Sequence, residues 1–175
     1  SRGLGDVYKR QHPLDCLTCE KSGDCKLEKY AYELKVSSSR FTGEKNVYLI
    51  ENSNPFIERD YNKCILCGNC ILACNEVEYQ EVYDYAYRGF KTKVSTAFEK
   101  PLLETGCVFC GQCVRVCPAG AIIEKGKKGK GREWEFTKVK TTCPYCGCGC
   151  EIELNVKEGE IVRVTSDPKS AVNQG

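Results

Sequence analysis

The sequence has no long apolar run, no large net charge and only one histidine. No stretch approaches the roughly 20 apolar residues that a membrane-spanning helix needs, so no membrane span is expected. The formal net charge of +2 gives no reason to expect a nucleic-acid partner or an anionic membrane surface. No secretory signal peptide precedes the cysteines. Residues 1–11 show no periodicity and are expected to be non-native or disordered, and the chain is interpreted as an internal fragment.

Cysteine is the residue that the sequence has in excess. The 15 cysteines among 175 residues fall in four tight groups. In a short chain this content usually indicates a disulfide scaffold, but the count is odd and the groups repeat a C-x-x-C spacing. Thiolates so close in sequence are placed to share a metal, and a reducing compartment, the cytoplasm, is then expected. Because metal centres would replace aliphatic side chains, we expect a thin core and a stability that depends on the metal.

Two of the groups form an internal repeat, C-x2-C-x2-C-x3-C. Three cysteines two residues apart can wrap one corner of a 4Fe–4S cluster, and Gly68 and Gly111 inside the loops are expected at positive φ. In two-cluster ferredoxins the fourth cysteine of each run ligates the other cluster, and we expect it to begin a short helix. The expected ligand sets are therefore crossed: Cys64, Cys67, Cys70 and Cys117 in one, and Cys107, Cys110, Cys113 and Cys74 in the other. Structural zinc competes with this interpretation, but zinc needs only two C-x2-C pairs.

The first group has the spacing His12-x3-Cys16-x2-Cys19-x5-Cys25. Three thiolates leave one iron of a 4Fe–4S cluster without a protein ligand, and an imidazole nitrogen suits iron. Although a lone histidine is usually a structural residue, His12 stands just ahead of three clustered cysteines and is predicted to be the fourth ligand. A neutral imidazole in place of an anionic thiolate should raise the reduction potential of that cluster.

These motifs resemble three related families. HPLDC-x2-C-x5-C followed by an eight-cysteine module resembles the large peripheral subunit of complex I, the iron-only hydrogenases, and the catalytic subunits of formate dehydrogenases. The complex I subunit usually has one four-cysteine cluster at the ferredoxin position, so the double set disfavours it. The fourth group, TTCPYCGCGC, resembles the start of molybdopterin oxidoreductases and most closely that of formate dehydrogenases, whereas a hydrogenase would continue into its own catalytic-cluster motifs.

The resemblance implies the N-terminal electron-transfer region of a molybdenum- or tungsten-dependent formate dehydrogenase. It implies four 4Fe–4S clusters, with a bis-molybdopterin guanine dinucleotide site elsewhere in the parent enzyme, so no catalytic residue is assigned within the chain. Cys143, Cys146 and Cys150 match the family spacing as ligands of the fourth cluster, and Cys148 is then not a ligand. The fourth ligand is expected within about five residues after Gly175. The implied partner is a subunit or carrier that accepts electrons, such as NAD-reducing diaphorase subunits, ferredoxin or a hydrogenase.

Three alternatives remain open. The first is a non-catalytic electron-transfer protein, in effect a polyferredoxin. The second is another molybdopterin oxidoreductase or a complex I-like subunit. The third is a zinc-stabilised interaction module, which iron and acid-labile sulfide analysis would separate from the relay interpretations.

The expected fold class is α+β, with small loop-rich domains. The expected domains are a 4Fe–4S domain with one histidine and three cysteine ligands at 12–50, a two-cluster ferredoxin-type domain at 51–125, a linker or hairpin at 126–140, and a β-rich molybdopterin-oxidoreductase 4Fe–4S domain at 141–175. Helical spacing predicts a helix over Lys26–Val36, and loose alternation predicts a strand within Lys91–Phe98. Alternation also predicts a hairpin of Glu151–Val156 with Ile161–Val164. The glycine-spaced basic run at 125–132 is expected to be a solvated linker, and residues 76–87 have no assignment.

Overall fold

The computed structural model describes residues 11–39 and 41–175. The chain divides into two compact units, residues 1–125 and 126–175, and the predicted domains 12–50 and 51–125 lie together in the first. The expectation for residues 1–11 lies, apart from Gln11, outside the described residues. Within the described ranges, no helix has the length and apolar character needed to cross a membrane.

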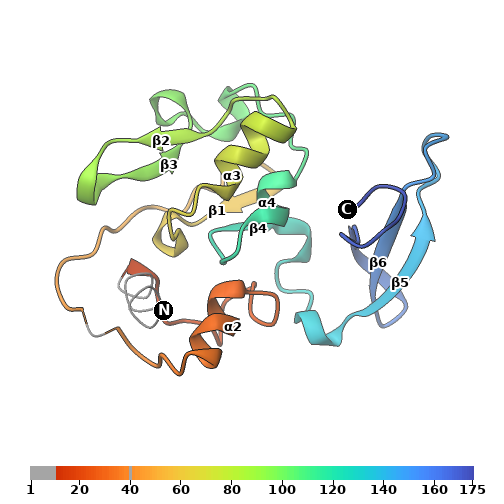
Figure 1. The fold of residues 1–175 in the computed structure, drawn as a ribbon, viewed down its shortest axis with the longest axis horizontal. Coiled ribbons are helices and arrows are strands. Elements are labelled where there is room, and N and C mark those ends of the chain that lie inside the picture. The colour runs from red at the N-terminus through yellow and green to blue at the C-terminus, as the bar shows by residue number, and fades with distance from the viewer. Residues whose placement is uncertain (1–10, 40) are drawn as a thin grey trace. The chain divides into compact units, whose positions relative to one another are not determined.

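The described part of the chain contains short helices and strands joined by loops (Figure 1). The helices are α2 (Lys26–Glu33), α3 (Asn69–Leu72), which a π-helical turn (Ala73–Val77) continues, and α4 (Gln112–Val116). The strands are β1 (Ile57–Arg59), β2 (Asp84–Ala86), β3 (Lys93–Ser95), β4 (Ile122–Glu124), β5 (Thr137–Thr142), β6 (Glu151–Lys157) and β7 (Glu160–Thr165). Single 3₁₀ turns occur at Tyr61–Lys63, Gly89–Lys91, Ala97–Glu99, Leu102–Glu104, Lys125–Lys127 and Glu133–Glu135.

Helix α2 begins directly after the last cysteine of the first group. The Cys25 sulfur accepts a hydrogen bond from the backbone N–H of Glu28 at 3.4 Å, so the thiol caps the helix. The Glu28 carboxylate reaches back to the hydroxyl of Ser22 and the backbone N–H of Gly23, both at 3.0 Å. The bond to Cys25 satisfies one of the N–H groups that a helix start leaves open, and the bonds of the Glu28 carboxylate hold the preceding turn against the helix. The helix ends three residues before the predicted Val36, because Lys35 takes a left-handed φ of 53°.

The middle of the chain repeats the order strand, cysteine loop, helix, strand. Strands β1 and β4 pair antiparallel, with Arg59 opposite Ile122, and β2 pairs antiparallel with β3. Figure 1 shows α3 and α4 next to each other, with the β1–β4 pair against α4. The two cysteine loops are thereby brought to the same region of the unit, although 37 positions separate Cys70 from Cys107 in the sequence.

The glycines in the two cysteine loops behave as the spacing predicts. Gly68 has φ of 76° and Gly111 has φ of 81°, and each is the residue before a helix. A Cβ on Gly68 would lie 2.7 Å from the Tyr85 hydroxyl oxygen. Both this close contact and the positive φ therefore exclude a side chain at this position.

The predicted place of the helices in the repeat was wrong. The third cysteine of each run, Cys70 and Cys113, lies inside α3 and α4, whereas Cys74 lies in the π-helical turn and Cys117 follows the end of α4. The αL glycine one residue ahead of each helix starts it, because the chain turns into helical geometry immediately after that residue. Neither fourth cysteine begins a helix, since Cys74 lies within the continuous helical stretch formed by α3 and the π-helical turn, and Cys117 directly follows α4.

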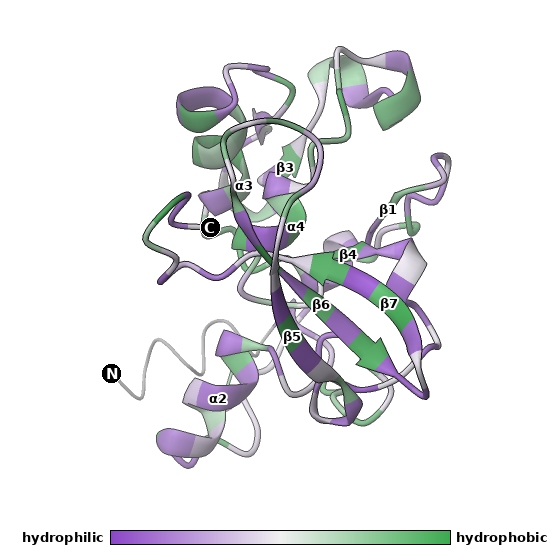
Figure 2. Ribbon diagram, turned by 90° about the vertical axis from the view of Figure 1, so that its right-hand side faces the viewer, coloured by the Kyte–Doolittle hydropathy of each residue, from purple (hydrophilic) through white to green (hydrophobic). Residues whose placement is uncertain are grey.

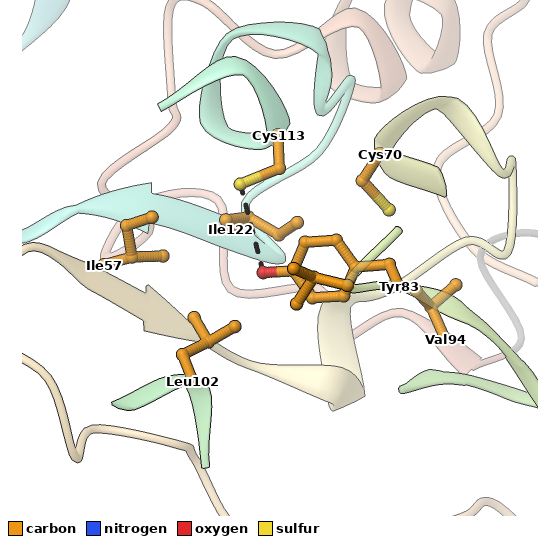
Figure 3. Close-up of a cluster of buried hydrophobic side chains, with 8 residues drawn as sticks. Ile57, Cys70, Tyr83, Val94, Leu102, Cys113 and Ile122 are labelled. Carbon is orange, nitrogen blue, oxygen red and sulfur yellow. Dashed lines mark hydrogen bonds between the residues drawn. The ribbon is translucent and has the colours of Figure 1, made fainter. Parts of the chain in front are cut away.

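The core of the first unit is small and includes sulfur. It consists of Ile57, Cys70, Val82, Tyr83, Val94, Leu102, Cys113 and Ile122, with further cysteines packed around it. Figure 3 shows Cys70 and Cys113 among the aliphatic side chains of this core. Leu102 is fully buried. The core therefore contains few of the aliphatic side chains whose burial normally stabilises a domain of this size.

The second unit is a three-stranded antiparallel sheet in the order β5-β6-β7. The predicted hairpin is confirmed as β6 and β7, joined at Lys157 and Glu160. Figure 2 shows hydrophilic and hydrophobic residues alternating along these two strands. Strand β5 begins at Thr137, within the segment expected to be a linker. The fourth cysteine group occupies the connection between β5 and β6, where Thr142 and Glu151 are register partners.

Candidate iron–sulfur sites

A cavity beside α3 collects four cysteines from both halves of the repeat. Its walls include Cys64, Cys67 and Cys70 from the first run and Cys117 from the second. We call this space cavity A. The remaining lining is largely apolar and includes Ile65, Val94, Ala119, Ala121 and Ile122.

A second cavity shows the reciprocal grouping. It is lined by Cys107, Cys110 and Cys113 from the second run and by Cys74 from the first. We call it cavity B. The cysteines thus separate into the two crossed sets that the two-cluster pattern requires, since each run contributes three residues to one cavity and its fourth residue to the other.

Tyr83 contributes to the walls of both cavities. Its side chain is 2% exposed, and its hydroxyl group donates a hydrogen bond to the sulfur of Cys113 at 3.9 Å. Figure 3 shows the hydroxyl directed at Cys113, with Cys70 near the other end of the side chain. Tyr83 therefore separates the two groups of cysteines and contacts one of them through a polar atom.

Burial controls the ionisation of the cysteines around the cavities. It raises the pKa of the Cys70 thiol to about 12 and those of Cys64 and Cys113 to about 11. Neighbouring cysteines raise the pKa of Cys70 further, because several thiolates in one small space repel each other. Cationic metal offsets this cost, so iron would have to displace protons from these thiols on binding.

Backbone N–H groups point toward several of these sulfurs. The N–H of Leu66 donates to the Cys64 sulfur at 3.4 Å. Burial raises the pKa of Cys117, while hydrogen bonds with the backbone of Ala119, Ile122 and Ala121 lower it. Such bonds stabilise a thiolate and are one way in which proteins set the potential of a cluster.

The first cysteine group packs against a distant part of the chain. Cys19 is 6% exposed, and a Cβ on Gly120 would lie 2.6 Å from its sulfur. The Cys25 sulfur lies 3.5 Å from the carbonyl oxygen of Pro118. The first group therefore packs on the segment that follows Cys117, one of the cysteines of cavity A. Cys16, the remaining cysteine, is partly buried.

His12 is held in a form suited to binding a metal. Its ring is 6% exposed, and burial lowers the pKa of the imidazole, which favours the neutral form of the ring. Nδ1 lies 2.6 Å from the carbonyl oxygen of Pro13. Because a carbonyl can only accept, Nδ1 carries the proton and Nε2 has the free lone pair. Nε2 is buried and has no hydrogen-bond partner among the described residues, which is the state expected of a ligand nitrogen.

The fourth group lies in an open loop. The backbone N–H of Cys143 donates to the carbonyl of Cys150 at 2.8 Å, which closes the loop at its base. Cys146 and Cys148 are exposed, and Cys143 and Cys150 are partly buried. Hydrogen bonds from the backbone and thiol of Cys148 lower the pKa of Cys146. The structure thus brings Cys148 into contact with a predicted ligand without burying it.

The cysteines supply the type of ligand that iron–sulfur clusters use. No disulfide joins the 15 cysteines, all of which lie in the described part of the chain. Within residues 11–39 and 41–175, no three ligand side chains converge closely enough for one metal ion. Four thiolates around an apolar cavity are the ligand set of a 4Fe–4S cluster, and soft thiolates favour iron–sulfur chemistry.

Two residues near the cavities escaped the sequence interpretation. Arg59 lines cavity A as a buried cation, and Tyr83 lies between the cavities. Arg59 stands five residues before Cys64, where a charged residue beside an apolar one gave no recognisable motif. Tyr83 belongs to the stretch 76–87 that periodicity left unassigned.

Three family models together match nearly the whole chain. Residues 54–141, half of the chain, match the ferredoxin-like domain of NADH-quinone oxidoreductase subunit 3. Residues 4–40 match the NADH-ubiquinone oxidoreductase-G iron-sulfur binding region, and residues 136–175 match the molybdopterin oxidoreductase Fe4S4 domain. These matches support 4Fe–4S clusters as the cofactors.

Individual proteins give a consistent result. The alpha subunit of the NADPH-Fe(3+) oxidoreductase of Geobacter sulfurreducens is 38% identical over 94% of this chain and 19% of its own length. A Staphylococcus aureus protein provisionally named formate dehydrogenase is 28% identical over 97% of this chain and 21% of its own length. The chain thus spans about a fifth of the length of these relatives.

A solved structure agrees with the fold. A chain of the NAD+-reducing [NiFe]-hydrogenase in its H2-reduced state matches with a TM-score of 0.64 and 32% identity, over 71% of this chain and 53% of that chain. Taken with the family models, it indicates a mixed α and β iron–sulfur region with ferredoxin-like and molybdopterin Fe4S4 parts. The chain therefore belongs to the family whose model describes the ferredoxin-like domain of NADH-quinone oxidoreductase subunit 3. It corresponds to the N-terminal 4Fe–4S region found in this complex I subunit and in molybdopterin oxidoreductases.

Proposed function

We propose that this chain is an electron relay built on 4Fe–4S clusters within a larger oxidoreductase subunit. The observation that supports it most is the pair of cavities, each lined by three cysteines of one run and the fourth cysteine of the other. Bound 4Fe–4S clusters supply one-electron oxidation and reduction. The proposed ligands are His12, Cys16, Cys19 and Cys25; Cys64, Cys67, Cys70 and Cys117; Cys74, Cys107, Cys110 and Cys113; and Cys143, Cys146 and Cys150.

The chain's own residues would hold the clusters and control their surroundings. The walls of the cavities are largely apolar, and the αL glycines Gly68 and Gly111 turn the backbone into the helices that contain Cys70 and Cys113. Hydrogen bonds such as that from Leu66 N–H to Cys64 offset the charge of the thiolates. Water exclusion and hydrogen bonding are the factors by which a protein sets cluster potentials.

The first site and cavity A would be near neighbours in the relay. Cys25 approaches the carbonyl of Pro118, and Pro118 is bonded to Cys117. One ligand of each proposed site is thereby connected through a single proline residue. Short separations between sites favour electron transfer, so this contact supports an order in which the His12 site exchanges electrons with the site in cavity A.

The fourth site would need one further ligand from the parent protein. Asn173 accepts a hydrogen bond from the backbone N–H of Glu151 at 3.1 Å and from the hydroxyl of Ser170 at 2.8 Å. The segment around Asn173 therefore lies against the residue that follows Cys150. A cysteine soon after Gly175 could reach the same loop, and we propose that it completes the set with Cys143, Cys146 and Cys150.

Metal and sulfide analysis tests the relay directly. Protein purified without oxygen should contain about 12 iron atoms and as many acid-labile sulfides for the three complete ligand sets. After reduction it should give several 4Fe–4S signals in electron paramagnetic resonance spectra. Stoichiometric zinc without sulfide would instead support the zinc-stabilised interaction module and overturn the proposal.

We further propose that the parent enzyme interconverts formate and carbon dioxide at a molybdenum or tungsten bis-pterin site outside this chain. The cysteine pattern of the fourth group and the relative provisionally named formate dehydrogenase support this, whereas the complex I models match more of the chain. The acceptor would be a partner such as diaphorase subunits, ferredoxin or a hydrogenase. The purified parent protein should reduce a viologen dye with formate and contain molybdenum or tungsten. Dye reduction by NADH alone, without either metal, would favour the complex I-like alternative.

A further inference from the structure

A buried arginine lies at the edge of cavity A. Arg59 ends β1 and is 4% exposed. Its guanidinium Nε lies 2.6 Å from a carboxylate oxygen of Glu51, and Nη2 donates to the Tyr61 hydroxyl at 2.5 Å. Burying an arginine is costly unless it is paired. Glu51 supplies that pairing, and the backbones of the two residues also form a bridge.

The charge of Arg59 is directed at the tyrosine that separates the cavities. The guanidinium carbon lies 5.0 Å from the centre of the Tyr83 ring and 5.0 Å from that of the Tyr61 ring. Both contacts are within the range of cation–π attraction. Burial lowers the pKa of Arg59, but Tyr83, Tyr61 and Glu51 together outweigh it and raise the pKa, so the side chain stays charged.

The polar groups of Arg59 and Tyr83 stand at different cavities. Arg59 is part of the wall of cavity A, together with Cys64, Cys67, Cys70 and Cys117. Tyr83 lines both cavities and donates a hydrogen bond to the sulfur of Cys113 in cavity B. The cation thus lies beside one group of cysteines, and the hydroxyl group contacts the other.

We infer that Arg59 and Tyr83 set the reduction potentials of the two clusters proposed for cavities A and B, Arg59 for cavity A and Tyr83 for cavity B. The inference rests on the proposed function. A reduced cluster carries one more negative charge than an oxidised one, so a buried cation nearby stabilises the reduced form and raises the potential. A hydrogen bond to a ligand sulfur acts in the same direction. Arg59 and Tyr83 would act through their charge and hydrogen bond on the surroundings of the clusters, and neither residue binds iron.

Glu51 makes the direction of the effect testable. Its carboxylate partly cancels the charge of Arg59, so Glu51→Gln should expose the cluster in cavity A to more of that charge. The glutamine oxygen can still accept from the backbone N–H of Leu102, which Glu51 does at 3.0 Å. Removing the cation with Arg59→Gln and removing its counter-ion with Glu51→Gln should therefore shift the potentials in opposite directions.

The experiment is a redox titration of the reconstituted chain, followed by electron paramagnetic resonance. Each signal is assigned with Cys67→Ser, which alters the cavity A site, or Cys110→Ser, which alters the cavity B site. Arg59→Gln should lower the ratio of reduced to oxidised cluster at a fixed potential about tenfold at the cavity A site, a shift of about 59 mV for one electron. Glu51→Gln should raise that ratio, and Arg59→Lys, which keeps the charge, should largely restore it.

Tyr83→Phe distinguishes the effect of Tyr83 from that of Arg59. It removes the hydroxyl group while keeping the ring, so it should lower the potential of the cavity B site and leave that of the cavity A site nearly unchanged. Iron and sulfide contents report whether each variant still assembles its clusters.

The outcomes distinguish the inference from the proposed function. A wild-type chain that takes up no iron and sulfide contradicts the proposed function. A chain with intact clusters whose potentials do not change in Arg59→Gln contradicts the inference alone. Equal shifts of the same sign in Arg59→Gln and Glu51→Gln would mean general damage to the fold and would also overturn it.

Discussion

The sulfur of Cys25 lies 3.5 Å from the carbonyl oxygen of Pro118. The backbone N–H of Leu27 donates to the same oxygen at 3.3 Å. The contact joins the first cysteine group to the residue after Cys117, across 93 positions of the sequence. Substitutions in the segment that follows Cys117 should therefore alter the first cysteine group as well as cavity A.

Gly120→Ala should damage the first site. The new Cβ would lie 2.6 Å from the Cys19 sulfur, 3.4 Å from Cβ of Lys21 and 3.5 Å from Cδ of Lys63. Cys19 must move to admit it, which we expect to cost about 1–3 kcal/mol of stability. Iron content and thermal unfolding of the reconstituted protein measure the effect.

Gly106→Ala is the matched control. Gly106 also adjoins a predicted ligand, Cys107, but a Cβ there would meet nothing within 4 Å and its backbone is not left-handed. The control should keep its full iron content. If both variants lost iron equally, crowding at Cys19 would not be the cause.

His12→Ala should remove or destabilise one cluster. The neutral ring presents a buried Nε2 without a partner among the described residues, and alanine has no nitrogen to replace it. We expect about four fewer iron atoms per chain. His12→Cys is the rescue variant, and it should restore the iron while lowering the potential of that cluster, because an anionic thiolate replaces a neutral ring. Unchanged iron content and spectra in His12→Ala would return the residue to a structural role.

The cysteine substitutions should fall into pairs that cross the repeat. Cys74→Ser should alter the same spectroscopic signal as Cys110→Ser, because both residues line cavity B. Cys117→Ser should alter the same signal as Cys67→Ser, since both line cavity A. Electron paramagnetic resonance of the reduced variants measures this. Pairing of Cys74 with Cys67 would refute the crossed arrangement.

Cys148 should be dispensable for cluster binding, whereas Cys146 should not. Both side chains are exposed and hydrogen-bonded to each other, so the structure alone does not rank them as ligands. Cys148→Val should keep the iron bound by the fourth group in the parent protein, and Cys146→Ser should reduce it. Equal loss in both would mean that Cys148 is a ligand.

The spacing of the cysteines predicted much of the first unit. A repeat of three closely spaced thiols with an internal glycine determines the local backbone, and Gly68 and Gly111 have the expected positive φ. The alternation in residues 151–164 likewise predicted the β6–β7 hairpin, because side chains on a strand point to opposite faces. Local rules of this kind need no information from distant residues.

Long-range packing set the limit of prediction. Tyr83 lies between the cavities because Val82 and Tyr83 pack in the same core as Cys70 and Cys113, and a run of tyrosines and acidic residues has no periodicity that shows this. Arg59 is buried through its contacts with Glu51 and two tyrosine rings. The helices were also misplaced, since the αL glycine and not the fourth cysteine determines where each begins.

The most direct test of the crossed cluster sites is anomalous diffraction at the iron absorption edge from crystals of the reconstituted chain. The account predicts one group of iron peaks bounded by Cys64, Cys67, Cys70 and Cys117, and another bounded by Cys74, Cys107, Cys110 and Cys113. Iron enclosed by Cys64, Cys67, Cys70 and Cys74, or cavities that hold zinc in place of iron, would contradict it.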